Sequence, residues 1–176
     1  AQGLTFVRPP YVSEIALAAR AWVAEWGRIL QRGALLLIDY GFPQREYYHP
    51  QRAEGTLMCH YRHHAHGDPF WLPGLNDITA HVDFTAIAEA GHDAGLDVLG
   101  YISQANFLLN CGIGELLAQK VGAGDTANMA DLRARGAVNV LISPNEMGEL
   151  FKVIALGRGV PEPLIGFARG HRAARQ

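Results

Sequence analysis

Apolar positions along this chain alternate between helical and strand-like spacing. From 15 to 30 they return at helical intervals, after Ser13, which suits an N-cap, and before Gly33, which suits a helix end. The apolar run 34–38 is too short for a helix, so we expect a strand that is buried on both faces. A short strand is also expected at 4–7. The residues at this helical spacing are Ile15, Ala18, Ala19, Trp22, Trp26, Ile29 and Leu30. Of these, Trp22 and Trp26 are expected to pack in the core.

After residues 41–82, the chain again shows a helical pattern followed by a strand-like one. Asp83 suits the N-cap of a helix that ends near Gly95. The later elements that we expect are a strand at 96–102, a helix from Ser103 that breaks at Gly112 and resumes to 120, a short helix capped by Asp125 and stopped near Gly136, and a strand at 150–156. Alternating helices and strands predict an α/β fold in one domain over 1–176, with 168–176 as a frayed basic tail.

The gap between these two halves, 41–82, is the strongest candidate for a functional segment. It follows a strand that ends in Asp39-Tyr40-Gly41, and α/β enzymes place their ligands at the carboxyl edge of the sheet. It contains no long periodic run, and long loops without regular structure are usually functional. We therefore interpret 41–82 as an active-site loop.

Composition limits the classes of function. The chain has 176 residues, of which 49% are hydrophobic, and 15 basic against 17 acidic residues give a net charge of -2. This balance argues against a nucleic-acid partner, and no apolar run approaches the roughly 18 residues that cross a bilayer. Two cysteines do not make a disulfide scaffold. We therefore expect neither a nucleic-acid nor a membrane partner, and a cytoplasmic location.

Acidic and imidazole side chains in and beside this segment are candidates for chemistry. Asp39 lies at a strand end, where an aspartate either acts on a ligand or fixes a loop by binding backbone amides. The period of two puts Asp77, Thr79, His81 and Asp83 on one side of an extended segment. His81 suits a general base, and a histidine satisfied by backbone carbonyls fits equally well. Asp83 suits a helix cap better than a base.

Other polar and aromatic residues leave alternatives open. Glu14 either interacts favourably with a helix N-terminus or orients a substrate. Cys59, His63 and Asp68 suggest a zinc site, but their spacing matches no zinc signature, so we predict no metal. The aromatic residues that either line a pocket or form a small core for the loop are Tyr40, Tyr48, Tyr61, Phe70 and Trp71.

Several separated motifs occur in a fixed order between the first expected helix and the last strand. They are Asp39-Tyr40-Gly41, Tyr48-His49-Pro50, Gly55-Thr56-Leu57, Asp68-Pro69, Pro73-Gly74, the run from Asp77 to Phe84, the run from Gln104 to Leu109, Met147-Gly148 and Phe151-Lys152-Val153. Together they resemble the MidA-like family of S-adenosylmethionine-dependent methyltransferases. That family includes bacterial members and a mitochondrial complex I assembly factor.

This resemblance implies the C-terminal half of a class I, Rossmann-like methyltransferase sheet, with 41–82 as a long inserted loop. The strand at 34–38 corresponds to the fifth of that sheet, and the strands at 96–102 and 150–156 to the sixth and seventh. The seventh is expected to run antiparallel between the other two. No Gly-rich turn follows a strand here, so S-adenosyl-L-methionine is expected to bind mostly to an N-terminal half that this sequence lacks. No cofactor-binding residue is assigned within the chain.

The function implied by the resemblance is methyl transfer to a protein substrate. An arginine acceptor and a respiratory complex I subunit as partner are implied with it, as is the mitochondrial matrix as location in a eukaryote. We assign catalysis to Asp39, Asp77 and His81, and substrate binding to Tyr40, Tyr48, His60, Arg62 and Thr79.

Two other functions stay open at this point. The first is a non-catalytic piece that binds a partner, or a second copy, through an exposed sheet edge. Such a piece is expected to have no activity by itself. A metal-dependent hydrolase built on the histidine-rich segment is the less favoured alternative.

Overall fold

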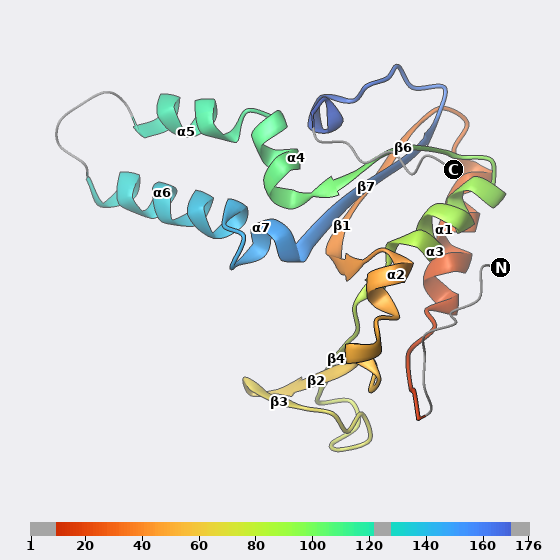
Figure 1. Cartoon of the computed structure of the whole chain (residues 1–176). Helices are drawn as coiled ribbons and strands as arrows, with labels where there is room; N and C mark the ends of the chain where they lie inside the picture. Colours follow the sequence, from red (N-terminus) through yellow and green to blue (C-terminus); the bar gives the residue numbers. More distant parts are fainter. Residues whose placement is uncertain (1–9, 122–127, 170–176) are drawn as a thin grey trace.

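A mixed sheet with strand order β5-β1-β7-β6 forms the centre of the protein (Figure 1). The computed structural model describes residues 10–121 and 128–169. β7 (Phe151–Arg158) pairs antiparallel with β1 (Gly33–Phe42) on one side and with β6 (Asp97–Ser103) on the other. β5 (Val82–Asp83) pairs in parallel with the last two residues of β1. The expected order, with the last strand antiparallel between the other two, is confirmed.

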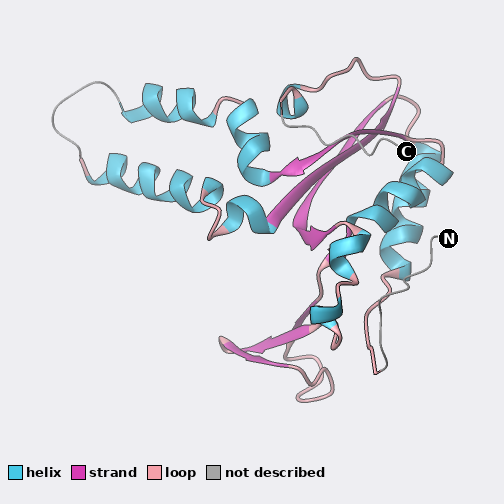
Figure 2. Cartoon of the chain, viewed as in Figure 1, coloured by secondary structure: helices cyan, strands magenta, loops and turns pink. Residues whose placement is uncertain are grey.

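Helices cover the two faces of this sheet unequally (Figure 2). α1 (Leu17–Ile29) and α3 (Phe84–Asp93) pack on one face, where Val23, Phe84, Ile87, Ile154 and Leu156 form a buried cluster. α4 (Gln104–Asn110) and the short helix η2 (Ile165–Phe167) cover the other face over β6 and β7. The second buried cluster there consists of Leu99, Ile102, Val153, Ala155 and Phe167.

β1 is less buried than its sequence predicts. Leu35 and Leu37 pack against the cluster beneath α1 and α3. Leu36 and Ile38 point to the opposite face and keep 45% and 47% of their surface exposed. The expectation of a strand buried on both faces is therefore wrong for this chain, because α4 and η2 cover β6 and β7 but leave the second face of β1 open.

The first helix also differs from the expectation. It begins at Leu17 rather than after Ser13, and its N-cap residue Ala16 makes no side-chain cap. The preceding segment is engaged elsewhere, because Val12 N–H donates to Ala53 O at 2.8 Å. Trp22 keeps 48% of its surface exposed, so its assignment to the core is wrong, and it contacts Trp26 edge to face. The strand expected at 4–7 lies outside the described residues.

Segment 41–82 contains several short elements. α2 (Gln44–Tyr47) and η1 (Pro50–Arg52) are followed by an antiparallel sheet of order β3-β2-β4, formed by β2 (Met58–Tyr61), β3 (His64–His66) and β4 (Asp77–Thr79). This small sheet projects away from the central sheet in Figure 1. Its strands are too short to produce a periodic signal, which is why the sequence indicates only a loop.

The helical region after β6 forms an arm on the far side of the sheet. α5 (Ile113–Val121) begins after Gly112, as expected, and pairs with α6 (Met129–Ile142). α6 passes through Gly136, so the stop expected there is wrong; one glycine costs only about 1 kcal/mol in a helix. A capping box between Asn128 and Asp131 begins α6, and Asp125 lies outside the described residues. α7 (Met147–Leu150) leads into β7.

None of the helices within 10–121 and 128–169 combines the length and the apolar character needed to cross a bilayer.

Arg158, at the end of β7, joins the ends of α1 and α3. Its guanidinium donates to the carbonyl oxygens of Leu30 at 2.9 Å, Gly27 at 3.1 Å, Ala94 at 3.2 Å and Gly95 at 3.0 Å. These carbonyls lie at or just beyond the C-terminal ends of the two helices. The last carbonyls of a helix lack intrahelical donors and carry the negative end of the helix dipole. One cation therefore fixes both helices to the sheet.

Replacing Arg158 with Met tests this contribution. We expect Arg158→Met to lower the free energy of unfolding by about 2–3 kcal/mol, because several carbonyls lose a charged donor together. Urea denaturation followed by circular dichroism measures the change. Arg32→Met is the matched control, since Arg32 makes one exposed hydrogen bond to Gly159 O and should change stability by about 0.5 kcal/mol or less. Equal effects of the two substitutions would contradict this role of Arg158.

Candidate functional site

Two adjoining concavities lie near the carboxyl end of β1. The first, of about 330 Å³, is named the Glu14 concavity, and its polar and aromatic lining includes Glu14, Arg20, Gln44, Tyr47, Tyr48, His81 and Asp83. The second, of about 550 Å³, is named the Asp77 concavity and is lined by Tyr40, Thr56, Met58, His60, Asp77, Thr79, His81 and Leu150. His81 lines both and so belongs to the wall between them.

The residues chosen from the sequence fall in three places. Those that line the Asp77 concavity are Tyr40, His60, Asp77, Thr79 and His81. Tyr48 lines the Glu14 concavity. Asp39 is exposed beside a groove on β1, and its carboxylate accepts from the adjacent Tyr40 N–H at 2.8 Å. Arg62 is exposed between β2 and β3, with its guanidinium 5.4 Å from the Tyr61 ring. Asp39 and Arg62 therefore line neither concavity, although the Asp39 charge acts on the pKa of His81.

Strand pairing explains why the Asp77 concavity collects distant residues. In the small sheet His60 lies opposite Asp77, and Met58 lies opposite Thr79. The Thr79 hydroxyl also donates to Met58 O at 3.3 Å. Opposed residues of antiparallel strands share a face, so these side chains point the same way. The register thus places an imidazole, a carboxylate and a hydroxyl on one surface.

His81 is held among aromatic rings. Its ring stacks on Phe42 at a centroid distance of 5.1 Å and meets Tyr40 edge to face at 5.2 Å. Burial lowers the pKa of the imidazole from 6.5, and the Arg52 guanidinium lowers it further, against opposing effects of Glu14 and Asp39. Its Nδ1 atom is buried and has no hydrogen-bond partner within the described part of the chain. The ring is therefore uncharged at neutral pH and able to accept a proton.

Glu14 connects the segment before α1 to the loop that carries Thr56. Its carboxylate accepts from the backbone N–H groups of Thr56 and Leu57, each at 2.9 Å, and from the Thr56 hydroxyl at 3.2 Å. Burial raises the pKa of Glu14, but the donors from Leu57 and Thr56 outweigh it and hold the pKa below 4.5. Glu14 lies before α1 rather than in its first turn, so the expected interaction with a helix N-terminus is replaced by a contact across more than forty residues.

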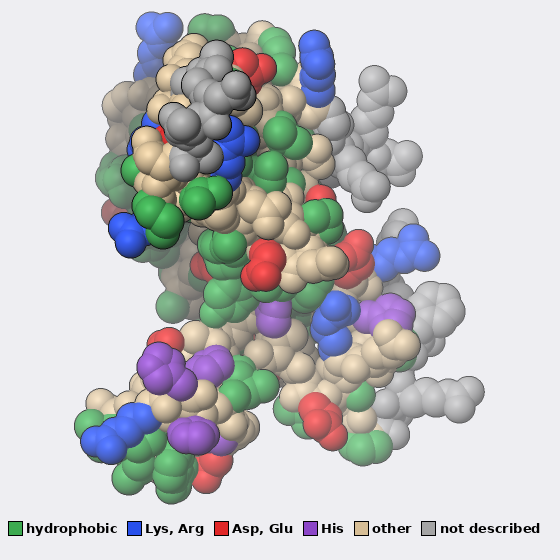
Figure 3. All heavy atoms as spheres, turned by 90° about the vertical axis from the view of Figure 1, so that its left-hand side faces the viewer, with side chains coloured by type: hydrophobic (Ala, Val, Ile, Leu, Met, Phe, Trp, Pro, Cys, Tyr) green, Lys and Arg blue, Asp and Glu red, His purple; other side chains and the backbone are tan. Residues whose placement is uncertain are grey.

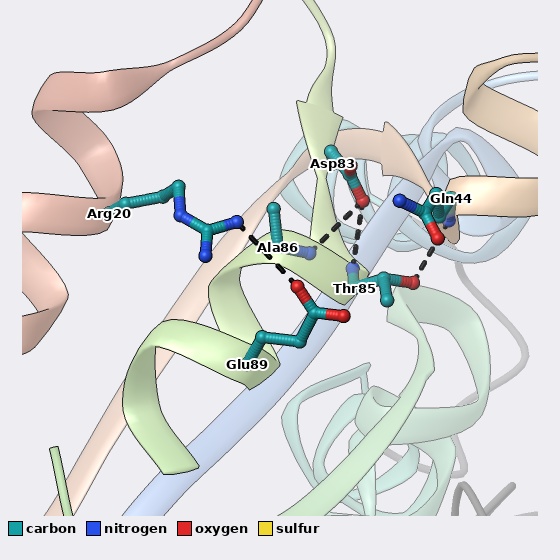
Figure 4. Close-up of polar contacts among 6 residues, drawn as sticks. All are labelled: Arg20, Gln44, Asp83, Thr85, Ala86 and Glu89. Atoms are coloured by element: carbon teal, nitrogen blue, oxygen red, sulfur yellow. Dashed lines mark hydrogen bonds and ion pairs between the residues drawn. The ribbon is translucent and has the colours of Figure 1, made fainter. Parts of the chain in front are cut away.

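Asp83 acts as the expected helix cap (Figure 4). Its carboxylate accepts from the N–H groups of Thr85 at 3.0 Å and Ala86 at 3.2 Å. Burial raises the pKa of Asp83, and these two donors oppose that shift. The Thr85 hydroxyl accepts from Gln44 N–H at 2.9 Å, which ties α2 to α3. The capping role does not remove Asp83 from the wall of the Glu14 concavity.

Two tyrosines complete that concavity. Tyr47 is buried, and its hydroxyl lies 3.4 Å from a Glu14 carboxylate oxygen. Tyr48 meets Tyr47 edge to face, with ring centroids 4.9 Å apart. Burial is the main reason that the pKa of each phenol is raised. The Glu14 concavity therefore gathers a carboxylate, an imidazole and two phenols whose pKa values are all displaced, which is typical of functional sites.

The histidine-rich part of the chain lies on the small sheet, and imidazoles gather on the projecting lower lobe in Figure 3. His66 contacts Asn76 Oδ1 at 3.2 Å and the Trp71 ring edge to face. Cys59 is buried opposite His66 and Ile78. Within the described ranges, no group of His, Cys, Asp or Glu side chains is arranged to hold a metal ion. The set of Cys59, His63 and Asp68 therefore gains no support as a ligand cluster.

Glu14 and Thr56 were not among the residues assigned to the site from the sequence. The sequence predicts for Glu14 only a contact with a helix N-terminus or with substrate, and Thr56 occurs there only within the motif Gly55-Thr56-Leu57. The signal that connects them to His81 is a set of long-range hydrogen bonds, which no local pattern contains.

Comparison with known proteins identifies the family. A sequence profile described as "Putative S-adenosyl-L-methionine-dependent methyltransferase" matches residues 2–102, more than half of the chain. The chain belongs to this methyltransferase family. The resemblance to MidA-like methyltransferases is thus confirmed, and the cofactor of the family is S-adenosyl-L-methionine.

Curated relatives and solved structures agree with this assignment. "Protein arginine methyltransferase NDUFAF7, mitochondrial" from Danio rerio is 32% identical over 142 residues, covering 76% of this chain and 31% of the relative. The protein of that name from Mus musculus is 33% identical over 127 residues, covering 70% and 26%. A Burkholderia thailandensis crystal structure bound to S-adenosyl-homocysteine is 59% identical, with a TM-score of 0.86 over 93% of this chain and 41% of that one. This chain therefore spans less than half of each.

The described residues do not include the glycine turn expected of a cofactor site. A class I methyltransferase cradles its cofactor with a strand, a Gly-rich turn and a helix, as dinucleotide-binding folds do. In the described ranges, Gly112 and Gly114 follow helix α4 rather than a strand. The chain supplies acidic and aromatic walls at the carboxyl edge of β1, and it supplies no glycine turn of that kind within the part that is described.

The contacts of Glu14 predict an acid-sensitive contribution to stability. Because its pKa is lower in the folded chain than 4.5, the carboxylate stabilises the fold above pH 4.5, and this stabilisation is lost as the pH falls below that value. We expect Glu14→Gln to lower the free energy of unfolding at pH 7 by about 1–2 kcal/mol, a value reduced for partial solvent exposure. Denaturant titrations between pH 3 and pH 7 measure it.

The exposed Glu54, on the same loop, supplies the control for this substitution. Glu54→Gln should change the free energy of unfolding by about 0.5 kcal/mol or less throughout the range from pH 3 to pH 7. The difference between wild type and Glu14→Gln should shrink as the pH falls below 4.5, and a difference that stays constant with pH would contradict the proposed origin of the stabilisation.

Proposed function

We propose that this chain forms the acceptor side of an S-adenosyl-L-methionine-dependent methyltransferase that acts on a protein, with an arginine side chain as the methyl acceptor. The observation that carries the proposal is the convergence of Tyr40, His60, Asp77, Thr79 and His81 on one concavity at the carboxyl edge of β1. The arginine acceptor is supported by the names of the NDUFAF7 relatives. A complex I subunit as the target and the location in the cell stay predictions.

Five residues of the Asp77 concavity have a direct role in this proposal. The Asp77 carboxylate pairs with the guanidinium of the acceptor in bidentate geometry and orients one nitrogen. The uncharged His81 imidazole accepts the proton that this nitrogen loses as its bond to the methyl group forms. Tyr40 forms an aromatic wall beside the cation, and His60 and Thr79 bind the substrate next to it. Tyr48 contacts the substrate from the neighbouring concavity. Asp39 and Arg62 line neither concavity, so no step is assigned to them here.

The bound cofactor supplies an electrophilic methyl group on a sulfonium. The residues of this chain hold the acceptor in line, exclude water and remove one proton. The rate of methyl transfer depends on how precisely the acceptor is held in line with the methyl group. Small displacements of Asp77 or His81 should therefore lower the rate steeply.

Methyl transfer by a chimaera tests the proposal. This chain would be joined to the portion of the Burkholderia relative that it does not cover, since 59% identity favours a compatible junction. We expect methylarginine in an arginine-rich peptide incubated with S-adenosyl-L-methionine, detected by mass spectrometry. His81→Gln and Asp77→Asn should each lower the rate by about 100-fold.

His63→Gln is the control, because His63 is exposed in the turn between β2 and β3. It should leave the rate within about twofold, as for a surface position away from the reacting groups. Methylation of residues other than arginine, or full activity of both His81→Gln and Asp77→Asn, would reject the assignment.

A second candidate function is association through β1. Trp22, Leu36, Ile38 and Asp39 line a groove of about 380 Å³ on this strand, and the first three are large apolar residues with 45–48% of their surface exposed. Exposed apolar patches next to an unpaired strand edge favour binding of further polypeptide. We infer that this surface takes the part of the protein that relatives contain beyond the region matched here.

A substitution in the groove tests this second proposal. Ile38→Arg should abolish co-purification of this chain with the separately expressed remainder of the Burkholderia relative, because a charge replaces an apolar contact on β1. Val98→Arg is the control, since Val98 is 38% exposed on β6 at the other side of the sheet. Retention of the complex by Ile38→Arg, with circular dichroism showing an intact fold, would reject β1 as the docking surface.

A further inference from the structure

The backbone of His81 is fixed through one hydroxyl group. His81 N–H donates to the Thr56 Oγ1 atom at 3.0 Å, and that hydroxyl donates its own hydrogen to a Glu14 carboxylate oxygen at 3.2 Å. The two bonds use the hydroxyl once as acceptor and once as donor, so their polarity is consistent. Three segments that are far apart in the sequence meet at this atom.

We propose that Thr56 and Glu14 are positioning residues for His81, the base proposed above, and hold its imidazole on the wall between the two concavities. This inference rests on the proposed function for the role of His81, and on the hydrogen bonds alone for its position. Neither Thr56 nor Glu14 needs to touch the acceptor.

The contacts around Thr56 show why these bonds determine a position. The Glu14 carboxylate also accepts from the N–H groups of Thr56 and Leu57, so the hydroxyl cannot move without breaking several bonds. Gly55 has a φ of +81°, and a Cβ atom there would lie 2.2 Å from a Glu14 carboxylate oxygen. The turn therefore needs glycine both for its backbone angle and for the approach of the carboxylate.

On its other side, His81 is followed by Val82, which pairs with Gly41 of β1. The His81 ring contacts Phe42 and Tyr40 through their faces and edges, and these contacts allow sliding. The charged groups that act on the imidazole are Arg52 on η1, Asp39 on β1 and Glu14 before α1. The hydrogen bond from the His81 backbone to Thr56 adds a directional contact to the pairing of Val82 with β1, and together they set where the ring starts among these neighbours.

Thr56→Val tests the proposal because it keeps the shape of the side chain and removes the hydroxyl. In NMR spectra of this chain, the His81 amide should exchange with solvent about five- to tenfold faster than in wild type, the effect of losing one hydrogen bond of about 1 kcal/mol. The pKa of the His81 imidazole should move toward 6.5 as the ring gains access to water. His81→Gln assigns the resonances.

Thr56→Ser is the conservative variant and retains the hydroxyl. It should keep both the slow amide exchange and the lowered pKa, whereas a role in packing alone would make Ser and Val equally disruptive. The positioning role is overturned if Thr56→Val leaves exchange and titration unchanged, or if Thr56→Ser behaves like Thr56→Val.

These spectra separate the inference from the proposed function. If Thr56→Val alters His81 as expected and His81→Gln keeps full methyl transfer in the chimaera, the positioning by Thr56 stands and the role of His81 as base falls. If His81→Gln lowers transfer and Thr56→Val changes neither spectrum nor rate, the base stands and the positioning is rejected.

Discussion

The arrangement of the candidate site depends on one carboxylate, that of Glu14. It binds the N–H groups of Thr56 and Leu57, and these bonds fix the middle of segment 41–82 to the residues that precede α1. Charge-assisted bonds to backbone amides are among the stronger hydrogen bonds in proteins, and they become more effective with partial burial. The loop that carries Thr56 is also bound to other parts of the chain by the His81 N–H on the Thr56 hydroxyl and by Val12 N–H on Ala53 O.

The consequences of this contact extend to both concavities. Thr56 lines the Asp77 concavity while its hydroxyl binds Glu14, which lines the other one. His81 lies between them and is bound to the same hydroxyl. Three groups with displaced pKa values therefore lie close together. The pKa of Glu14 is lowered, which keeps it ionised, the pKa of His81 is lowered, which keeps it uncharged, and the pKa of Asp83 is raised. Such divergent protonation behaviour is what acid–base chemistry at neutral pH requires.

The central sheet shows a different constraint. β7 is enclosed by strands on both sides and by helices on both faces, and its residues from Val153 to Gly157 are buried. β1 lacks cover on one face, which leaves Leu36 and Ile38 exposed beside Trp22. The solved relative with the matching fold is more than twice as long as this chain, so it contains polypeptide beyond the region in which β1 is left open. In the part of the chain that is described, the core is well packed around β7, and apolar side chains are exposed on the uncovered face of β1.

The sequence by itself determined the order of the main elements, the cap at Asp83 and the family. Strong apolar runs and N-cap chemistry are local, so β6, β7 and α3 could be predicted from them. The alternation at Asp77, Thr79 and His81 indicated a shared surface for the same reason. Only the tertiary structure decided that Asp39 lines neither concavity, that Trp22 is exposed, that α1 begins late and that Glu14 holds the loop. Those features depend on contacts between residues tens of positions apart and on which faces remain uncovered, and neither leaves a periodic trace in the chain.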